Sequence, residues 1–170
     1  MRSVNPQTGI KGMDIVLSNL HREIKKIKGR TNKGMIEAGM LIKNSMFKET
    51  PTIPFDTGNL RASFFMVTPI TSRGLDASFS DKKGKASEME SDHTSAIGEA
   101  KAKADVIKDP VLIIGFSANY ALWVHEMTGD INWNTPKGGA QPGAKFLQKA
   151  LKRNKKKILV VIRENAYIKK

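Results

Sequence analysis

A long segment near the N-terminus carries apolar side chains at steps of three and four residues, and this spacing constrains the fold more than any other feature of the chain. Its apolar positions are Met13, Val16, Leu17, Leu20, Ile24 and Ile27. Side chains at these steps share one face of an α-helix, which has 3.6 residues per turn. After Gly29 and Gly34 the spacing resumes and continues to Met46. The pattern predicts a long amphipathic helix that ends near Lys48 and is kinked or broken between the two glycines.

A turn and two strand patterns follow this helix. Pro51 and Pro54 lack a backbone N–H and favour an extended chain. The residues after them suit a tight turn, because Asp and Thr side chains bond nearby amides and Gly58 tolerates a positive φ. Apolar residues alternate over residues 60–68, and a continuous apolar run spans residues 111–116. We predict that these segments pair as strands, the second one central, in a hairpin with a long tip or in a three-stranded meander.

Between the two strand patterns, residues 71–109 are rich in Ser, Asp, Lys, Gly, Glu and Ala and contain few large apolar side chains. This composition is typical of a mobile loop, or of a partly helical arm over residues 86–104 that orders only against a neighbour. We therefore interpret residues 71–109 as an insertion in one domain that spans residues 1–170.

The last third of the chain combines a short helix, a loop and a basic helix. Residues 120–126 fit one or two helical turns, and the Gly, Pro and Asn content of residues 128–143 indicates a loop that carries Trp133. Helical spacing returns over residues 143–168, where a basic cluster interrupts it. The predicted fold is α+β, with long N-terminal and C-terminal amphipathic helices packed on a small, mainly antiparallel β-sheet.

Charge and composition narrow the classes of function. The formal net charge is +13, and the basic residues gather in the two long helical segments, which favours nucleic acid or an acidic protein surface as a partner. The absence of cysteine excludes disulfides and thiolate metal sites and is typical of a reducing compartment. We expect no secretory signal and no membrane span, because no run approaches about 20 apolar residues.

No residue pattern predicts an enzyme. His125 and Glu126 begin a His-Glu-x-x-His zinc motif, but Gly129 stands where the second imidazole is needed. His21 and His93 lie in a basic helix and in the polar insertion, where surface or hydrogen-bonded roles are the more ordinary ones. Nucleotide-binding glycine motifs and a nucleophile elbow are missing from the sequence. We therefore expect no catalytic residue, no metal and no cofactor.

Three short motifs occur in order along the chain. The first comprises Pro54, Asp56, Thr57, Gly58, Asn59, Leu60, Arg61 and Ser63. The second comprises Tyr120, Ala121, Val124, His125 and Glu126. The third comprises Pro142, Lys145, Phe146 and Leu147. Together with the helix before them and the basic helix after them, they resemble the tail-completion and head-tail joining (neck) proteins of long-tailed bacteriophages, over roughly residues 13–162.

The resemblance implies a non-enzymatic structural subunit of the virion, assembled in the host cytoplasm as a homo-oligomeric ring in the neck or tail. Its implied partners are head-connector or portal-side proteins and tail-terminator or tail-tube proteins, with transient contact to packaged DNA. The basic residues leave an alternative open, a sequence-nonspecific nucleic-acid-binding protein that uses its basic helices on phosphate. A phage nuclease or a small toxin has no residue constellation to support it.

Each candidate site has a structural and a functional interpretation. The first set forms a local turn or a subunit interface: Asp56, Thr57, Gly58, Asn59, Leu60 and Arg61. The second set is an aromatic or interface set: Tyr120, Trp123, Val124, His125, Glu126 and Trp133. Its members Tyr120, Trp123 and Trp133 fill the core, contact another subunit or stack on bases. The third set is a solvated helix face, or lines a DNA-conducting lumen, or grips an acidic partner: Lys152, Arg153, Lys155, Lys156 and Lys157.

Overall fold

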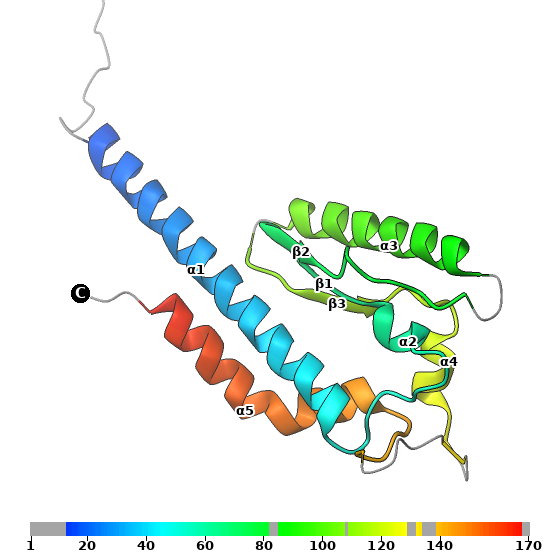
Figure 1. Ribbon diagram of the computed structural model, residues 1–170. Helices are drawn as coiled ribbons and strands as arrows, with labels where there is room; N and C mark the ends of the chain where they lie inside the picture. The colour runs from blue at the N-terminus through cyan, green and yellow to red at the C-terminus, as the bar shows by residue number, and fades with distance from the viewer. Residues whose placement is uncertain (1–12, 82–84, 108, 129–131, 134–138, 168–170) are drawn as a thin grey trace, which may run out of the picture.

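The computed structural model describes residues 13–81, 85–107, 109–128, 132–133 and 139–167. In chain order the elements are α1 (Met13–Lys48), α2 (Asn59–Ala62), β1 (Phe64–Thr68), β2 (Thr71–Arg73), α3 (Ala86–Val106), β3 (Ile113–Phe116), α4 (Ala121–Glu126) and α5 (Phe146–Ala166). Figure 1 shows the sheet between two helical layers, with α1 and α5 on one side and α3 on the other. Buried clusters lie on both sides of the sheet, so the predicted α+β fold is confirmed.

Helix α1 is unbroken from end to end, and the predicted kink or break between Gly29 and Gly34 is wrong. The partner helix α5 runs back along the C-terminal part of α1, in the opposite direction (Figure 1). A Cβ at Gly34 would lie 2.8 Å from the Asn165 Cβ and 3.1 Å from the Ile162 Cα. Gly34 therefore serves the close approach of two helices, and packing against α5 offsets its low helix propensity.

The sheet has the order β2-β1-β3, and both neighbouring pairs are antiparallel. The predicted pairing is confirmed, because Phe64 lies opposite Phe116 and Val67 opposite Ile113. The central strand is β1 and not the predicted second segment, and all five residues of β1 are buried. The order also excludes a meander, since the chain crosses through α3 before it adds β3 to the far edge of β1. Residues 60–62, predicted as strand, belong to α2.

The polar insertion folds mainly into α3, which confirms the helical alternative for residues 86–104. It packs on the chain's own sheet, so the expectation of an arm that orders only against a neighbour is wrong. Ile97, Ala100 and Ala104 bury against Phe65 and Val67 of β1. Ala100 and Ala104 let α3 lie close to the sheet, because their side chains are small.

His93 fixes the other part of α3. It is 3% exposed, its Nδ1 lies 2.7 Å from the Ser117 Oγ, and its Nε2 lies 2.6 Å from the Gly74 carbonyl oxygen. A carbonyl oxygen can only accept, so Nε2 carries a proton and donates it. The imidazole thus links α3 to the chain segments that follow β2 and β3. This is the hydrogen-bonded role that was expected for a histidine in this segment.

The C-terminal half agrees with most of its predicted elements. Helix α4 confirms the short helix at residues 120–126, and α5 runs without interruption through the basic cluster. Of the predicted loop over residues 128–143, the described residues 128, 132–133 and 139–143 form no helix or strand, and residues 129–131 and 134–138 lie outside the described ranges. Pro142 pairs with Thr52 in an isolated parallel bridge. Within the described residues, no helix is long and apolar enough to span a membrane.

Candidate functional site

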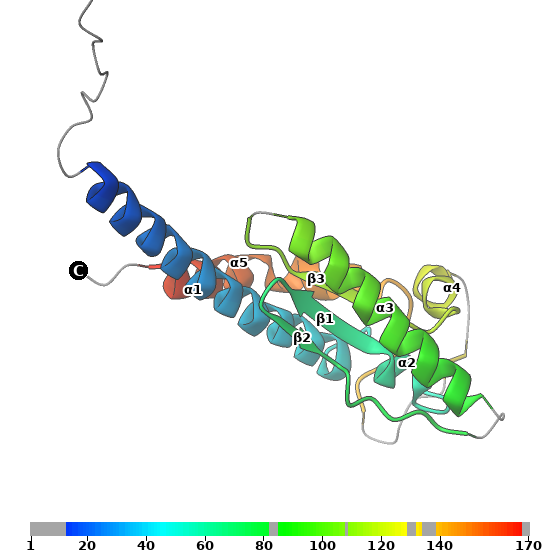
Figure 2. The ribbon, with the colours of Figure 1, turned by 90° about the horizontal axis from the view of Figure 1, so that it is seen from above.

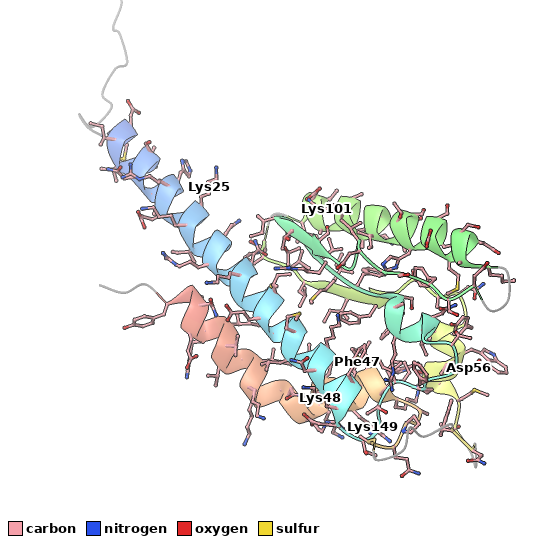
Figure 3. All side chains as sticks on the ribbon, viewed as in Figure 1. Lys25, Phe47, Lys48, Asp56, Lys101 and Lys149 are labelled. Carbon is pink, nitrogen blue, oxygen red and sulfur yellow. The ribbon has the colours of Figure 1, made fainter. Side chains whose placement is uncertain are left out.

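The first and second sequence motifs meet at one end of the molecule, around a pocket of about 440 Å³. Residues 54–60 form one wall of the pocket, and Tyr120, Val124 and Trp133 form another. Ser80, Lys85 and Met89 close it from the start of α3 and the segment before it. Figures 1 and 2 show α2 and α4 at the same end of the molecule, and Figure 3 places Asp56 there. The sequence order of the motifs gave no indication of this shared cavity.

The turn in the first motif is built by Gly58 and Asn59. Gly58 has a φ of +90°, which L side chains rarely adopt, and this explains the glycine. The Asn59 amide bonds the neighbouring segment twice: its Nδ2 donates to the Ser80 carbonyl at 3.1 Å, and its Oδ1 accepts from the Ser80 N–H at 2.7 Å. Asn59 is 8% exposed. Its side chain therefore holds two walls of the pocket together, a role that the sequence did not reveal.

Arg61 is bound within its own chain. Its Nε and Nη2 donate to the Ile53 carbonyl oxygen at 3.1 and 2.8 Å, and its guanidinium lies over the rings of Phe47 and Phe55. Desolvation in this setting lowers the pKa of Arg61. A subunit contact through Arg61 stays a prediction, and it would have to use the guanidinium atoms that Ile53 does not occupy.

The aromatic residues of the second candidate set, Tyr120, Trp123 and Trp133, divide between the pocket and the surface. Tyr120 lines the pocket and is 39% exposed, and burial, with a smaller effect of Asp56, raises the pKa of its hydroxyl. Trp123 is 72% exposed and its neighbour Leu122 is 73% exposed, so Trp123 is not a core residue of this subunit. Trp133 is half-buried in the pocket wall. Large apolar side chains with this exposure are typical of surfaces that contact another molecule.

The third motif fastens α4 to the start of α5. Lys145 has a φ of 59° and donates its backbone N–H to the His125 carbonyl at 2.7 Å, while its ammonium pairs with the Glu126 carboxylate. The His125 ring packs edge-on against Phe146 at 4.8 Å and its Nδ1 lies 2.7 Å from the Glu126 Oε1. Burial, with a smaller effect of Lys145, lowers the pKa of His125 and so favours the neutral imidazole. His125 and Glu126 therefore have a structural role here.

The basic cluster on α5 contains two kinds of residue. Arg153 pairs with Glu49 at 3.0 Å and donates to the backbone carbonyls of Ser45 and Thr50, which closes the C-terminal end of α1. The four other basic residues of the cluster are exposed: Lys152, Lys155, Lys156 and Lys157. Among the described residues of the cluster, these four have no ion pair that holds them, whereas the partly exposed Arg153 guanidinium is bound to Glu49 and to the backbone at the end of α1.

A second exposed apolar surface lies at the opposite end of the molecule. The N-terminal part of α1 projects past the end of α5 in both views (Figures 1 and 2). Its apolar face, here named the exposed stripe, has five residues that are each at least 40% exposed: Met13, Val16, Leu17, Leu20 and Ile24. The sequence predicted this face correctly, but nothing in the described residues covers it.

The described residues offer no cluster of three or more His, Cys, Asp or Glu side chains that could hold a metal ion. No protein-family model matches the chain, and comparison with curated proteins and with solved structures found no match. Any function must therefore be inferred from the two exposed apolar ends, the pocket and the basic face of α5.

Proposed function

We propose that this chain is a non-enzymatic structural subunit of a tailed bacteriophage, which assembles as a ring in the neck or at the end of the tail and joins the tail to the head. The order of the three motifs supports the proposal, and so does their joint use in one end of the fold. Motifs one and two line a single pocket, and motif three holds α4 against α5.

The observation that carries the proposal is the exposed apolar surface at both ends of the molecule. One end has the exposed stripe on α1, and the other has Leu122 and Trp123 beside the pocket. Exposed apolar side chains lower the solubility of a monomer, and their burial in a contact stabilises an assembly by about 25 cal/mol per Å². A ring subunit needs two such surfaces, one for each neighbour.

Electron microscopy of particles that lack the protein tests this function. We expect filled heads and separate tails, and we expect the purified wild-type chain to restore joining when it is added to them. A test variant carries Leu17→Ser and Leu20→Ser, which keeps the buried core but removes the centre of the exposed stripe. This variant should restore little joining compared with the wild-type chain. Normal joined particles in the absence of the protein would contradict the proposal.

A second candidate function is sequence-nonspecific binding of nucleic acid, favoured by the exposed lysines at positions 152 and 155–157 on α5. Binding of several lysines to phosphates releases the counterions that were condensed on the nucleic acid. This release is less favourable at high salt, so the affinity falls steeply as the salt concentration rises. Replacement of Lys155, Lys156 and Lys157 by Gln should then weaken duplex DNA binding and flatten its salt dependence. Unchanged binding by this variant, or no binding by the wild-type chain at low salt, would exclude this candidate.

A further inference from the structure

The exposed stripe continues a packing surface that is already used within the subunit. On the C-terminal half of α1, the same helical spacing brings Gly34, Ala38 and Ser45 into the buried region, and Gly34 and Ser45 contact α5. Over residues 13–26 every residue of α1 is exposed. This part has 14 residues, so at 1.5 Å per residue it is about 21 Å long. Residues 13–26 of α1 therefore leave an apolar face uncovered past the end of α5, and a second partner could pack on this face.

The flanks of this projecting helix are basic. Residues 13–30 contain Arg22, Lys25, Lys26, Lys28 and Arg30, against Asp14 and Glu23. Glu23 is already paired with Lys26 at 2.7 Å, and Lys26 lowers the pKa of Glu23 through this hydrogen bond. Pairing of this helix with its own counterpart would bring two such positive surfaces together, which is unfavourable. The charge instead favours an acidic surface as the partner.

The pocket end supplies a surface of the opposite character. Four exposed apolar side chains lie in or beside the pocket: Phe55, Tyr120, Leu122 and Trp123. Next to Met89 in the pocket wall, the first two turns of α3 carry Glu88, Glu90 and Asp92, all exposed. Within the described residues these three carboxylates form no salt bridge, and Lys85 lines the pocket beside them. Glu88 and Asp92 are one helical turn apart and share a face of α3. This end therefore combines an apolar pocket with two carboxylates on one face of the neighbouring helix.

The geometry points to head-to-tail assembly, in which the exposed stripe of one copy docks in the pocket of the next copy. We infer that Leu17 and Leu20 enter the apolar pocket, while Lys25 and Lys26 meet the carboxylates of α3. The stripe and the pocket lie at opposite ends of the molecule, and Figure 3 places Lys25 and Asp56 at these ends. Different surfaces on the two sides of a contact produce a ring or a filament, whereas identical surfaces stop at a dimer.

This inference rests on the proposed function, which it deepens by naming the contact between subunits. Two variants each remove one side of the contact. Leu17→Ser with Leu20→Ser removes the stripe, and Val124→Arg places a charged side chain in the pocket. The matched control is Leu151→Ser with Leu159→Ser, which changes two exposed leucines on α5 outside both surfaces. Helical circular dichroism and the Tm establish that each variant folds.

Analytical ultracentrifugation of the separate and mixed proteins gives the test. We expect the wild-type and control chains to form oligomers and each single-surface variant to be monomeric. A mixture of the two variants should form a one-to-one dimer that grows no further, because each supplies the surface that the other lacks. A wild-type chain that stays monomeric, a Val124→Arg chain that still assembles, or a mixture that stays monomeric would each overturn the inference.

Charge reversal provides a second test that does not depend on the fold of the pocket. Lys25→Glu with Lys26→Glu should weaken self-association about tenfold or more, and mixing with a Glu88→Lys, Asp92→Lys chain should restore it. Failure of this rescue would contradict the pairing of α1 with α3. If these tests fail while the protein still joins heads to tails, the docking inference falls and the neck function stands. If the association tests succeed but heads and tails join without the protein, the neck function falls and the docking inference stands.

Discussion

The two halves of α1 carry the same apolar spacing but have opposite surroundings. In the C-terminal half, Ala38, Ile42 and Met46 are at most 3% exposed, because α5 and the sheet cover them. In the N-terminal half, Val16 and Leu20 are 60% and 52% exposed. Periodicity therefore predicts which face of a helix is apolar, but the residues that cover this face have to come from somewhere else. In the C-terminal half they come from the same chain, and we propose that in the N-terminal half they come from another copy.

Truncation of one apolar residue in each half is the strongest test of this comparison. Met46→Ala should lower the free energy of unfolding by about 3 kcal/mol, because Met46 is fully buried and its loss leaves a cavity. Leu20→Ala should change the free energy of unfolding of the dilute monomer by less than about 0.5 kcal/mol. Urea unfolding at low protein concentration measures both. A large loss for Leu20→Ala under these conditions would mean that its own subunit covers it.

Gly29 and Gly34, two of the three glycines of α1, give the next largest contrast. Gly34→Ala should destabilise the fold by about 1–3 kcal/mol, since its Cβ would lie 2.8 Å from that of Asn165. Gly29→Ala should stabilise it by about 0.5–1 kcal/mol, because nothing lies within 4 Å of a Cβ there and alanine is the better helix former. Shifts of Tm in opposite directions are the expected result, and shifts in the same direction would contradict the close packing of α1 on α5 at Gly34.

The basic cluster of α5 contains one residue that binds the C-terminal half of α1, Arg153, and four exposed lysines that do not. Arg153→Gln should cost about 1–2 kcal/mol, because it leaves the last carbonyls of α1 and Glu49 without their charged partner. Lys156→Gln, one turn away and exposed, should change the free energy of unfolding by less than about 0.5 kcal/mol. Equal effects in chemical denaturation would show that Arg153 does not fasten α5 to α1.

The smallest expected effect concerns pH and the start of α5. Folding lowers the pKa of His125, so the unfolded state binds its proton more readily. The stabilisation by neutral His125 is complete above its unfolded pKa of about 6.5 and is lost as the pH falls below it, towards the lowered folded value. The Tm of the wild-type chain should therefore fall more between pH 7.5 and pH 5 than that of His125→Gln. Parallel Tm profiles would exclude a contribution from His125.

Much of the fold follows from local patterns in the sequence. The long helices, the pairing of β1 with β3 and the turn at Gly58 were predicted from periodicity and from turn chemistry. The central position of β1 was not, because both strand segments are apolar and sheet order depends on where the crossing helix packs. The role of α3 was also hidden, since its contact face consists largely of alanines, which add little to an apolar pattern.

The candidate site was predicted in its residues but not in its geometry. The three motifs were identified, yet nothing in their spacing showed that residues 54–60 and residues 120–124 enclose one cavity. Arg153 could not be distinguished from the lysines beside it, because its role depends on Glu49 and Thr50, which lie about a hundred residues away in the sequence. The positive φ of Lys145 had no sequence signal, since lysine rarely adopts it.

Hydrogen exchange of the wild-type chain, compared between the dilute monomer and the assembled form, tests the central claim most directly. Head-to-tail docking predicts that the amides of residues 13–26 exchange more slowly after assembly, together with those of residues 54–60 and 120–124. Protection of residues 13–26 alone, or of neither end, would contradict the claim that the uncovered half of α1 is completed by the pocket of the next copy.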